Sequence, residues 1–113
     1  MATYVLMLTL NGDGRQSMLA DPDSLLRAQN TIEIPGVSCL GLYGVLGRFD
    51  FVTILEAPDN DAAARFSLEL GVRAGAHIET LPAVPIGHFH AHHFETFEWA
   101  EEPGDGDMTG SAG

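Results

Sequence analysis

The stretch Gly44-Val-Leu-Gly-Arg-Phe-Asp-Phe-Val-Thr-Ile-Leu-Glu-Ala-Pro-Asp59 carries the clearest structural pattern in the chain. It contains a tight turn at Gly47, a strand at residues 49–56 that is apolar on both faces, and a helix start with Asp59 as the N-cap. A turn that leads into a strand and then directly into a helix indicates a domain of mixed α and β structure.

A strand, a helix and a second strand are predicted before this turn. Residues 3–10 are rich in β-branched and aromatic side chains and end at a turn signal in residues 11–14. An N-cap at Asp21 begins a helix that we expect to end near Glu33. Residues 37–46 form the second strand, in which two glycines indicate a bulge or a close backbone approach.

The same order of elements follows the turn. The helix that begins at Asp59 buries a stripe that includes Phe66 and Leu70, and Gly71 and Gly75 bracket its end. Residues 77–84 form the last strand, which we expect at the edge of the sheet because Pro82 interrupts it. The order β-α-β-β-α-β predicts an α+β, ferredoxin-like fold: a four-stranded antiparallel sheet with two helices on one face.

The second face of this sheet also needs a cover. The strands at residues 3–10 and 49–56 are apolar on both faces, but two helices cover only one face. Packing of the sheet against the sheet of a second copy is the simplest way to bury the other face. We therefore expect a homodimer or a higher oligomer.

Length and composition exclude several functional classes. The chain has 113 residues, enough for one domain, and a formal charge of −11 with no lysine. Its five arginines are scattered singly, so neither nucleic acid nor an anionic membrane surface is an expected partner. Neither a membrane span nor a secretory signal is recognisable, so we expect a cytoplasmic location. The single cysteine, Cys39, excludes an internal disulfide and is expected to be a small core residue.

Residues 46–64 contain a glycine, aromatic and aspartate signature, formed by Gly47, Phe49 and Asp50. With matching segments elsewhere in residues 3–84, this pattern resembles the GYD domain family, in which the aromatic residue is tyrosine. The resemblance implies a dimeric α+β barrel. It implies little about activity, because cofactor-free monooxygenases, haem enzymes and ligand-sensing domains share this fold.

Four histidines and a glutamate lie within eight residues: His88, His90, His92, His93 and Glu95. In a helix, His88, His92 and Glu95 would share one face and could hold Zn, Ni, Cu or non-haem Fe. In an extended segment, His88, His90 and His92 would share a face and offer three nitrogens to Cu or Zn. The spacing of apolar residues favours the helix. The alternative is a solvated segment whose histidines are polar surface.

A catalytic site is a weaker hypothesis. His77 and Glu79 share one side of their strand and could act as acid and base, or His77 could form a hydrogen bond at the sheet rim. Asp50 could bind a ligand or close the turn. Tyr4 and Tyr43 could project between sheet and helices, where a small apolar ligand would be held, or fill the core.

These predictions divide the chain into three parts. Residues 1–86 form the ferredoxin-like domain, residues 87–100 a histidine-rich, helical extension, and residues 101–113 an acidic, glycine-rich tail without stable structure. The expected function is binding of a transition metal by a homo-oligomer. The alternatives are a cofactor-free, oxygenase-like enzyme and a small-molecule sensor.

The metal hypothesis predicts that untagged protein, purified without a nickel column, contains a bound transition metal by elemental analysis. Replacing His88 and His92 together with alanine should abolish metal uptake and leave the oligomer intact, because the ligands lie outside the folded domain. Less than about a tenth of an equivalent of metal, with no thermal stabilisation by added Zn or Cu, would overturn the hypothesis.

Overall fold

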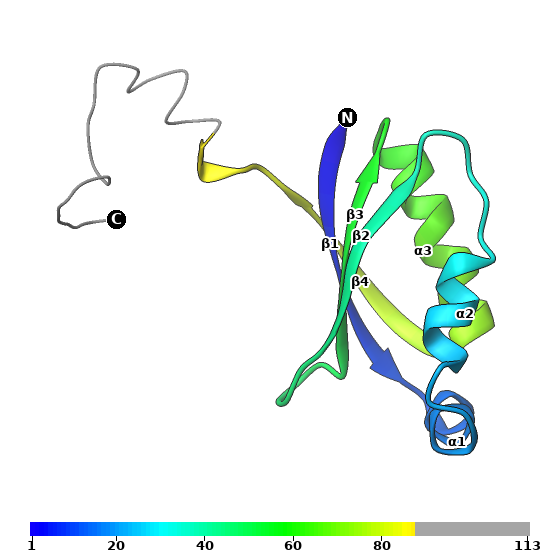
Figure 1. Cartoon of the computed structure of the whole chain (residues 1–113). Helices are drawn as coiled ribbons and strands as arrows, with labels where there is room; N and C mark the ends of the chain where they lie inside the picture. Colours follow the sequence, from blue (N-terminus) through cyan, green and yellow to red (C-terminus); the bar gives the residue numbers. More distant parts are fainter. Residues whose placement is uncertain (88–113) are drawn as a thin grey trace, which may run out of the picture. The chain divides into compact units, whose positions relative to one another are not determined.

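An antiparallel four-stranded sheet with helices on one face forms the unit Met1–Ala83 in the computed structural model (Figure 1). The structure describes residues 1–87, and a second unit begins at Val84. The predictions for the histidine-rich segment and the acidic tail lie outside the described residues. The elements are β1 (Ala2–Leu10), α1 (Gly12–Ala20), α2 (Ser24–Asn30), β2 (Ser38–Gly44), β3 (Phe51–Ala57), α3 (Asn60–Ala74) and β4 (Ala76–Ala83).

The sheet has the strand order β2-β3-β1-β4. The two strands predicted to be apolar on both faces, β1 and β3, therefore occupy the centre, and β4 lies at an edge as Pro82 indicated. In β2 the pairing with β3 is irregular between Cys39 and Gly41, which confirms the predicted bulge. The expected β-α-β-β-α-β order is confirmed, with one additional helix.

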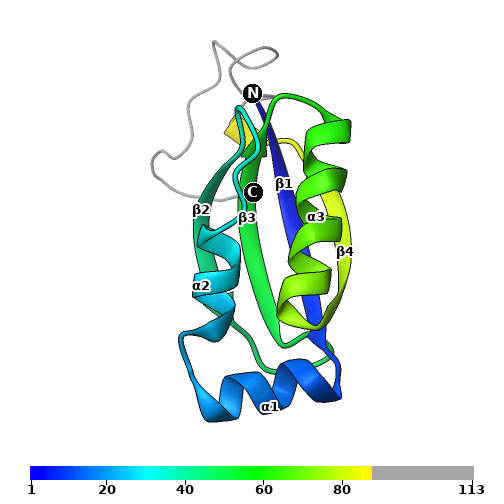
Figure 2. The same cartoon turned by 90° about the vertical axis from the view of Figure 1, so that its right-hand side faces the viewer.

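The hydrophobic core lies between the sheet and the helices. Alternate residues of β1 are buried, and α2 and α3 lie over the same face (Figure 2). Phe66 and Leu70 are buried on α3, which confirms the predicted apolar stripe of this helix. Its largest fully buried side chains are Leu6, Leu8, Thr53, Leu55, Phe66 and Leu70.

Helix α3 has the ends that the sequence predicted. The Asp59 side chain accepts a hydrogen bond from the backbone N–H of Ala62 at 2.9 Å, as an N-cap does. At the other end, Gly75 adopts the left-handed conformation with φ of 68°, and its N–H donates to the carbonyl of Gly71. Local sequence is sufficient at both ends because each cap involves residues within one turn of the helix.

The segment between β1 and β2 differs from the prediction. Residues 11–14 are not a turn: Asn11 caps the additional helix, α1, by accepting from the N–H of Gly14 at 2.8 Å. The single helix predicted from Asp21 is instead the shorter α2, with Asp23 at its N-cap position. The glycines at the start of α1 lower the helix propensity of this segment, so the sequence did not predict a helix here.

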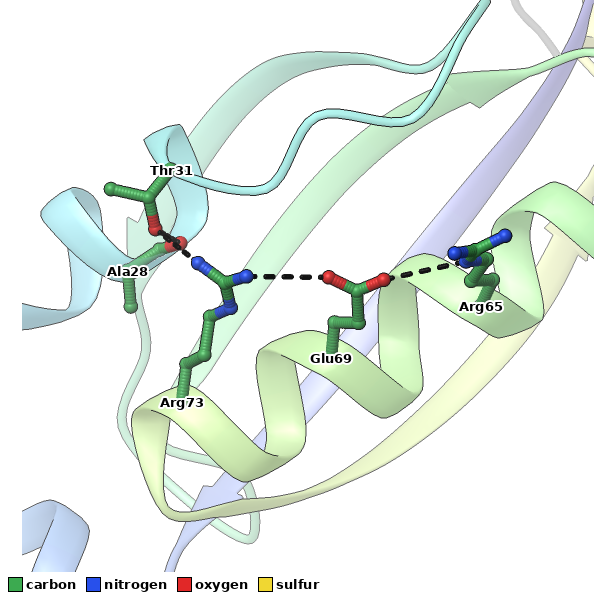
Figure 3. Close-up of polar contacts among 5 residues, drawn as sticks. All are labelled: Ala28, Thr31, Arg65, Glu69 and Arg73. Carbon is green, nitrogen blue, oxygen red and sulfur yellow. Dashed lines mark hydrogen bonds and ion pairs between the residues drawn. The ribbon is translucent and has the colours of Figure 1, made fainter.

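Two hydrogen-bonded contacts hold α2 in place. The buried hydroxyl of Thr53 on β3 donates to Gln29 Oε1 on α2 at 2.7 Å. At the surface, Arg73 on α3 donates to the hydroxyl of Thr31 at 2.9 Å and pairs with Glu69 (Figure 3). The buried bond matters more for stability, because surface ion pairs contribute little and a buried polar group without its partner costs about 1–3 kcal/mol.

Helix α1 is anchored where α3 turns into β4. The N–H of Asn11 donates to the carbonyl of Gly75 at 2.8 Å. The backbones approach so closely that a Cβ at Gly14 would lie 2.4 Å from the carbonyl oxygen of Gly75 and 2.7 Å from that of Ala74. Only glycine fits at this position.

Replacing Gly14 with alanine should therefore destabilise the domain by about 1–3 kcal/mol, because one of the two backbones must move. Gly12→Ala is the matched control, since it lies in the same helix and its Cβ would meet nothing within 4 Å. The control should be neutral or slightly stabilising. Urea unfolding followed by circular dichroism measures both; equal stability of the two variants would contradict the close contact.

Candidate functional site

The sheet face opposite α2 and α3 has an apolar centre that no other residue of the unit Met1–Ala83 covers. Strand register assigns its members, because side chains alternate between the two faces. Tyr43 is 58% exposed and Leu81 47% exposed. We call this surface the open-face patch; it consists of Val5, Met7, Tyr43, Val52, Ile54 and Leu81.

The patch is continuous across all four strands. Ile54 on β3 is opposite Val5 on β1, which is in turn opposite Leu81 on β4. In the adjacent row, Tyr43 on β2 is opposite Val52 on β3. Residues directly opposite on one face have Cβ atoms about 5 Å apart, so the apolar side chains lie in contact distance of one another.

Polar side chains surround the patch. Glu56 lies beyond it on β3, and Thr9 and His77 form an opposite pair at the other end of the same face. Glu79 on β4 is opposite Met7. An apolar centre with a polar rim is the usual composition of a protein–protein interface.

The Tyr43 ring extends the patch over the edge strand. A Cβ at Gly41 would lie 2.9 Å from a ring carbon of Tyr43, so the ring lies over the glycine. An aromatic side chain over glycine presents a broad, flat apolar surface on this edge of the sheet.

The β2–β3 hairpin continues the apolar surface. Its end is closed by a hydrogen bond from the N–H of Val45 to the carbonyl of Asp50 at 3.0 Å. Leu46 at its tip is fully exposed, and the Arg48 guanidinium lies over the Phe49 ring at 5.4 Å from its centroid. The hairpin bends to the side of the sheet away from the helices (Figure 1).

Asp50 joins the hairpin to β1. Its carboxylate accepts from the N–H of Leu10 at 2.9 Å, and its own N–H donates to the carbonyl of Leu8 at 2.8 Å. The carboxylate therefore joins the hairpin to β1, whereas the backbone carbonyl of Asp50 closes the turn. A ligand that binds the Asp50 carboxylate would have to share it with the backbone N–H of Leu10.

Two of the predicted catalytic residues, Tyr43 and His77, lie on opposite edge strands of the sheet. Tyr4 lies between sheet and helices as expected, but Tyr43 does not, and this expectation was wrong. The bulge after Cys39 inserts one residue and reverses the alternation, which turns Tyr43 to the open face. His77 shares that face from the opposite edge strand. A catalytic role for Tyr43, Asp50 and His77 stays a prediction.

The metal prediction concerns another part of the chain. Within residues 1–87, no three His, Cys, Asp or Glu side chains are grouped so that they could hold a metal ion. The predicted ligands, His88 to Glu95, lie outside the described residues. Among residues 1–87 there is also no helix that is long and apolar enough to cross a membrane.

A concave surface that the sequence analysis did not predict lies between α3 and β4. It has a volume of about 490 Å³, and its polar side chains include Asn60, Ser67 and Thr80. The sequence does contain a pattern that could have predicted this surface. Small residues recur at helical spacing on one side of α3, where Ala64 and Gly71 flank Ser67. Small side chains keep a helix surface shallow beside its neighbouring strand.

Cys39 lies at the edge of the core, as expected for a small apolar residue. It packs against the buried cluster and is partly exposed. Burial raises the pKa of its thiol from 9.0 to about 11, because a thiolate would lose solvation there. The thiol therefore stays protonated at neutral pH.

Comparisons with known proteins give one family and one fold. A family model described as GYD domain matches residues 4–92. The chain is 33% identical, over 87 residues, to a protein of Thermus thermophilus named glutamine synthetase and cystathionine beta-lyase binding protein; the match covers 76% of this chain and 92% of that protein.

Solved structures from Mycobacterium tuberculosis share the fold. The leucine response regulatory protein has a TM-score of 0.57 at 13% identity, covering 74% of this chain and 51% of that chain. The feast or famine regulatory protein complexed with L-methionine has a TM-score of 0.58 at 13% identity, covering 75% and 51%. The chain therefore spans about half the length of these regulators, and the likeness extends to the fold alone.

The raised pKa predicts that Cys39 reacts slowly with a disulfide reagent such as DTNB. Near pH 8, a thiol with a pKa of about 11 is roughly 100-fold less ionised than one with a pKa of 9, and the thiolate is the reacting species. Native protein should therefore react much more slowly than protein unfolded in urea. Equal rates, followed by absorbance in the two conditions, would contradict burial of this thiol.

Proposed function

The chain belongs to the GYD domain family, and from this premise we propose that it is a small protein-binding domain that pairs with a second copy through the open-face patch. The observation that carries the proposal is the apolar centre of that face, formed by the two central strands and both edges. Surfaces of this composition are favourable to bury and costly to leave in water.

Self-association fits the geometry of the patch. In a dimer with twofold symmetry, the same surface is used on both chains, so it must be self-complementary. A nearly uncharged centre meets this requirement, because no side chain of the patch carries a charge that would face its own copy. Two packed sheets lie about 10 Å apart, with the facing side chains interdigitated.

The relative from Thermus thermophilus supports binding to other proteins. Its name states that it binds glutamine synthetase and cystathionine beta-lyase, and it is similar to this chain over nearly its whole length. We extend to this chain the general class of function, binding to another protein. Of the predicted catalytic side chains, Tyr43 and His77 lie on opposite edge strands of the sheet, which favours such a domain over an enzyme.

Metal binding is a second proposal. It rests on the sequence of the segment from His88 to Glu95, with a transition metal such as Zn, Cu, Ni or Fe as the bound ion. The elemental analysis described with the sequence tests it independently of self-association.

Self-association can be tested with Ile54→Lys, which introduces a charge at the centre of the open-face patch. Sedimentation of wild-type protein should give twice the chain mass of 12.1 kDa, and the variant should raise the dissociation constant at least about 100-fold, because a charge would be buried without a partner.

Leu19→Lys is the matched control. Leu19 is 86% exposed on α1, away from the patch, so this variant should sediment like the wild type. A wild-type protein that remains monomeric at high concentration, or equal weakening by both substitutions, would overturn the proposed role of the patch.

A further inference from the structure

The groove between α3 and β4 lies on the helix side of the sheet, opposite the open-face patch. Its volume of about 490 Å³ is in the range of small-molecule sites, about 300–1,000 Å³. Most of its lining is apolar and comes from Ala64, Leu68 and Ile78. It therefore has the size and surface for a compact apolar molecule.

The lining contains no charged side chain, although the chain as a whole has a formal charge of −11. A charged ligand would lose its solvation here without gaining a partner of opposite charge. An anion would also meet the negative field of the protein. The groove thus favours a neutral molecule.

One end of the groove offers hydrogen-bond donors. The hydroxyl of Tyr4, whose side chain is otherwise buried, donates to Asn60 Oδ1 at 2.6 Å. In this arrangement the amide oxygen faces the hydroxyl, and the amide nitrogen is directed away from it. Within residues 1–87, the amide nitrogen of Asn60 donates to no other residue, so its N–H groups are available to a ligand.

The middle of the groove offers only an acceptor. The hydroxyl of Ser67 donates to the carbonyl of Ala63 at 3.0 Å, which uses its single proton. Thr80, whose Oγ1 is 2.6 Å from Ser67 Oγ, must then be the donor of that bond. The polar groups inside the groove therefore satisfy one another, and the remaining lone pairs of Thr80 cannot recognise an acceptor.

We propose that this groove binds a small, neutral, largely apolar molecule through a carbonyl oxygen that accepts from Asn60 Nδ2. The apolar body would lie along α3 toward Ser67, two turns or about 10 Å from Asn60. Because the groove and the open-face patch lie on opposite faces of the sheet, this proposal is independent of self-association.

The full chain, labelled with ¹⁵N, tests the proposal by NMR titration with acetophenone as the probe. Saturable shifts are expected at the amides of Asn60, Ala64, Ser67 and Thr80. Dissociation constants for so small a probe should be in the range of about 1–10 mM. Benzoate, which has a similar shape and a negative charge, should bind at least about 10-fold more weakly.

Asn60→Asp isolates the donor. It keeps an oxygen for the Tyr4 hydroxyl but removes the N–H groups, so acetophenone binding should weaken at least about 10-fold while the melting temperature is retained. Asn30→Asp, at the exposed end of α2, is the matched control and should bind like the wild type. Ala64→Phe, which fills the groove from an exposed helix position, should also abolish binding.

Three results would overturn the proposal. The first is the absence of saturable shifts at the α3 and β4 amides, and the second is equal binding by wild type and Asn60→Asp. The third is a preference for an extended peptide, tested with acetyl-Val-Thr-Val-Thr-Val-amide, which would instead assign the groove and the free edge of β4 to strand addition. Loss of the dimer in Ile54→Lys with retained acetophenone binding would separate the two proposals.

Discussion

Strand β1 is hydrogen-bonded on both sides, to β3 and to β4, and its side chains must therefore divide between the two faces of the sheet. Both sets are apolar. Tyr4, Leu6 and Leu8 are buried beneath the helices, whereas Val5 and Met7 lie on the face that the described helices leave open. A single central strand thus creates the core and the open-face patch together.

The position of the helices follows from contacts at their ends. The two caps define the ends of helix α3. The start of α1 packs against the turn at Gly75, where the backbone of Gly14 approaches the Gly75 carbonyl closely. Helix α2 is tied to the sheet by the buried bond between Thr53 and Gln29. These contacts fix the layer of helices on one face, and they leave the β4 side of α3 lined by small residues. The groove arises there.

Two surfaces of different chemistry result. The open-face patch is broad and apolar, which suits another protein surface and, in the proposed function, a second copy of the chain. The groove is smaller and contains an oriented amide at Asn60, which suits a small molecule. Because a fold can host many functions, it is these side chains, and not the shared fold with the regulators, that carry the functional proposals.

The sequence by itself determined the features that depend on neighbouring residues. The N-cap at Asp59, the left-handed end at Gly75, the two-faced apolar strands and the edge position of β4 are of this kind. Helix α1 was missed because its stabilising contact with Gly75 is 61 residues away from Gly14, and local propensity opposes a helix that begins Gly-Asp-Gly.

Only the tertiary structure decided which face each side chain of β2 occupies. The bulge after Cys39 is visible in the sequence as a weakened strand, but its position, and so the face of Tyr43, depends on how β2 pairs with β3. The groove depends in the same way on which side of α3 packs against β4. That packing brings Asn60 into hydrogen-bond contact with Tyr4, and Ser67 into contact with Thr80. The physical reason is that capping and alternation are local, whereas register and the meeting of distant side chains are set by the packed chain as a whole.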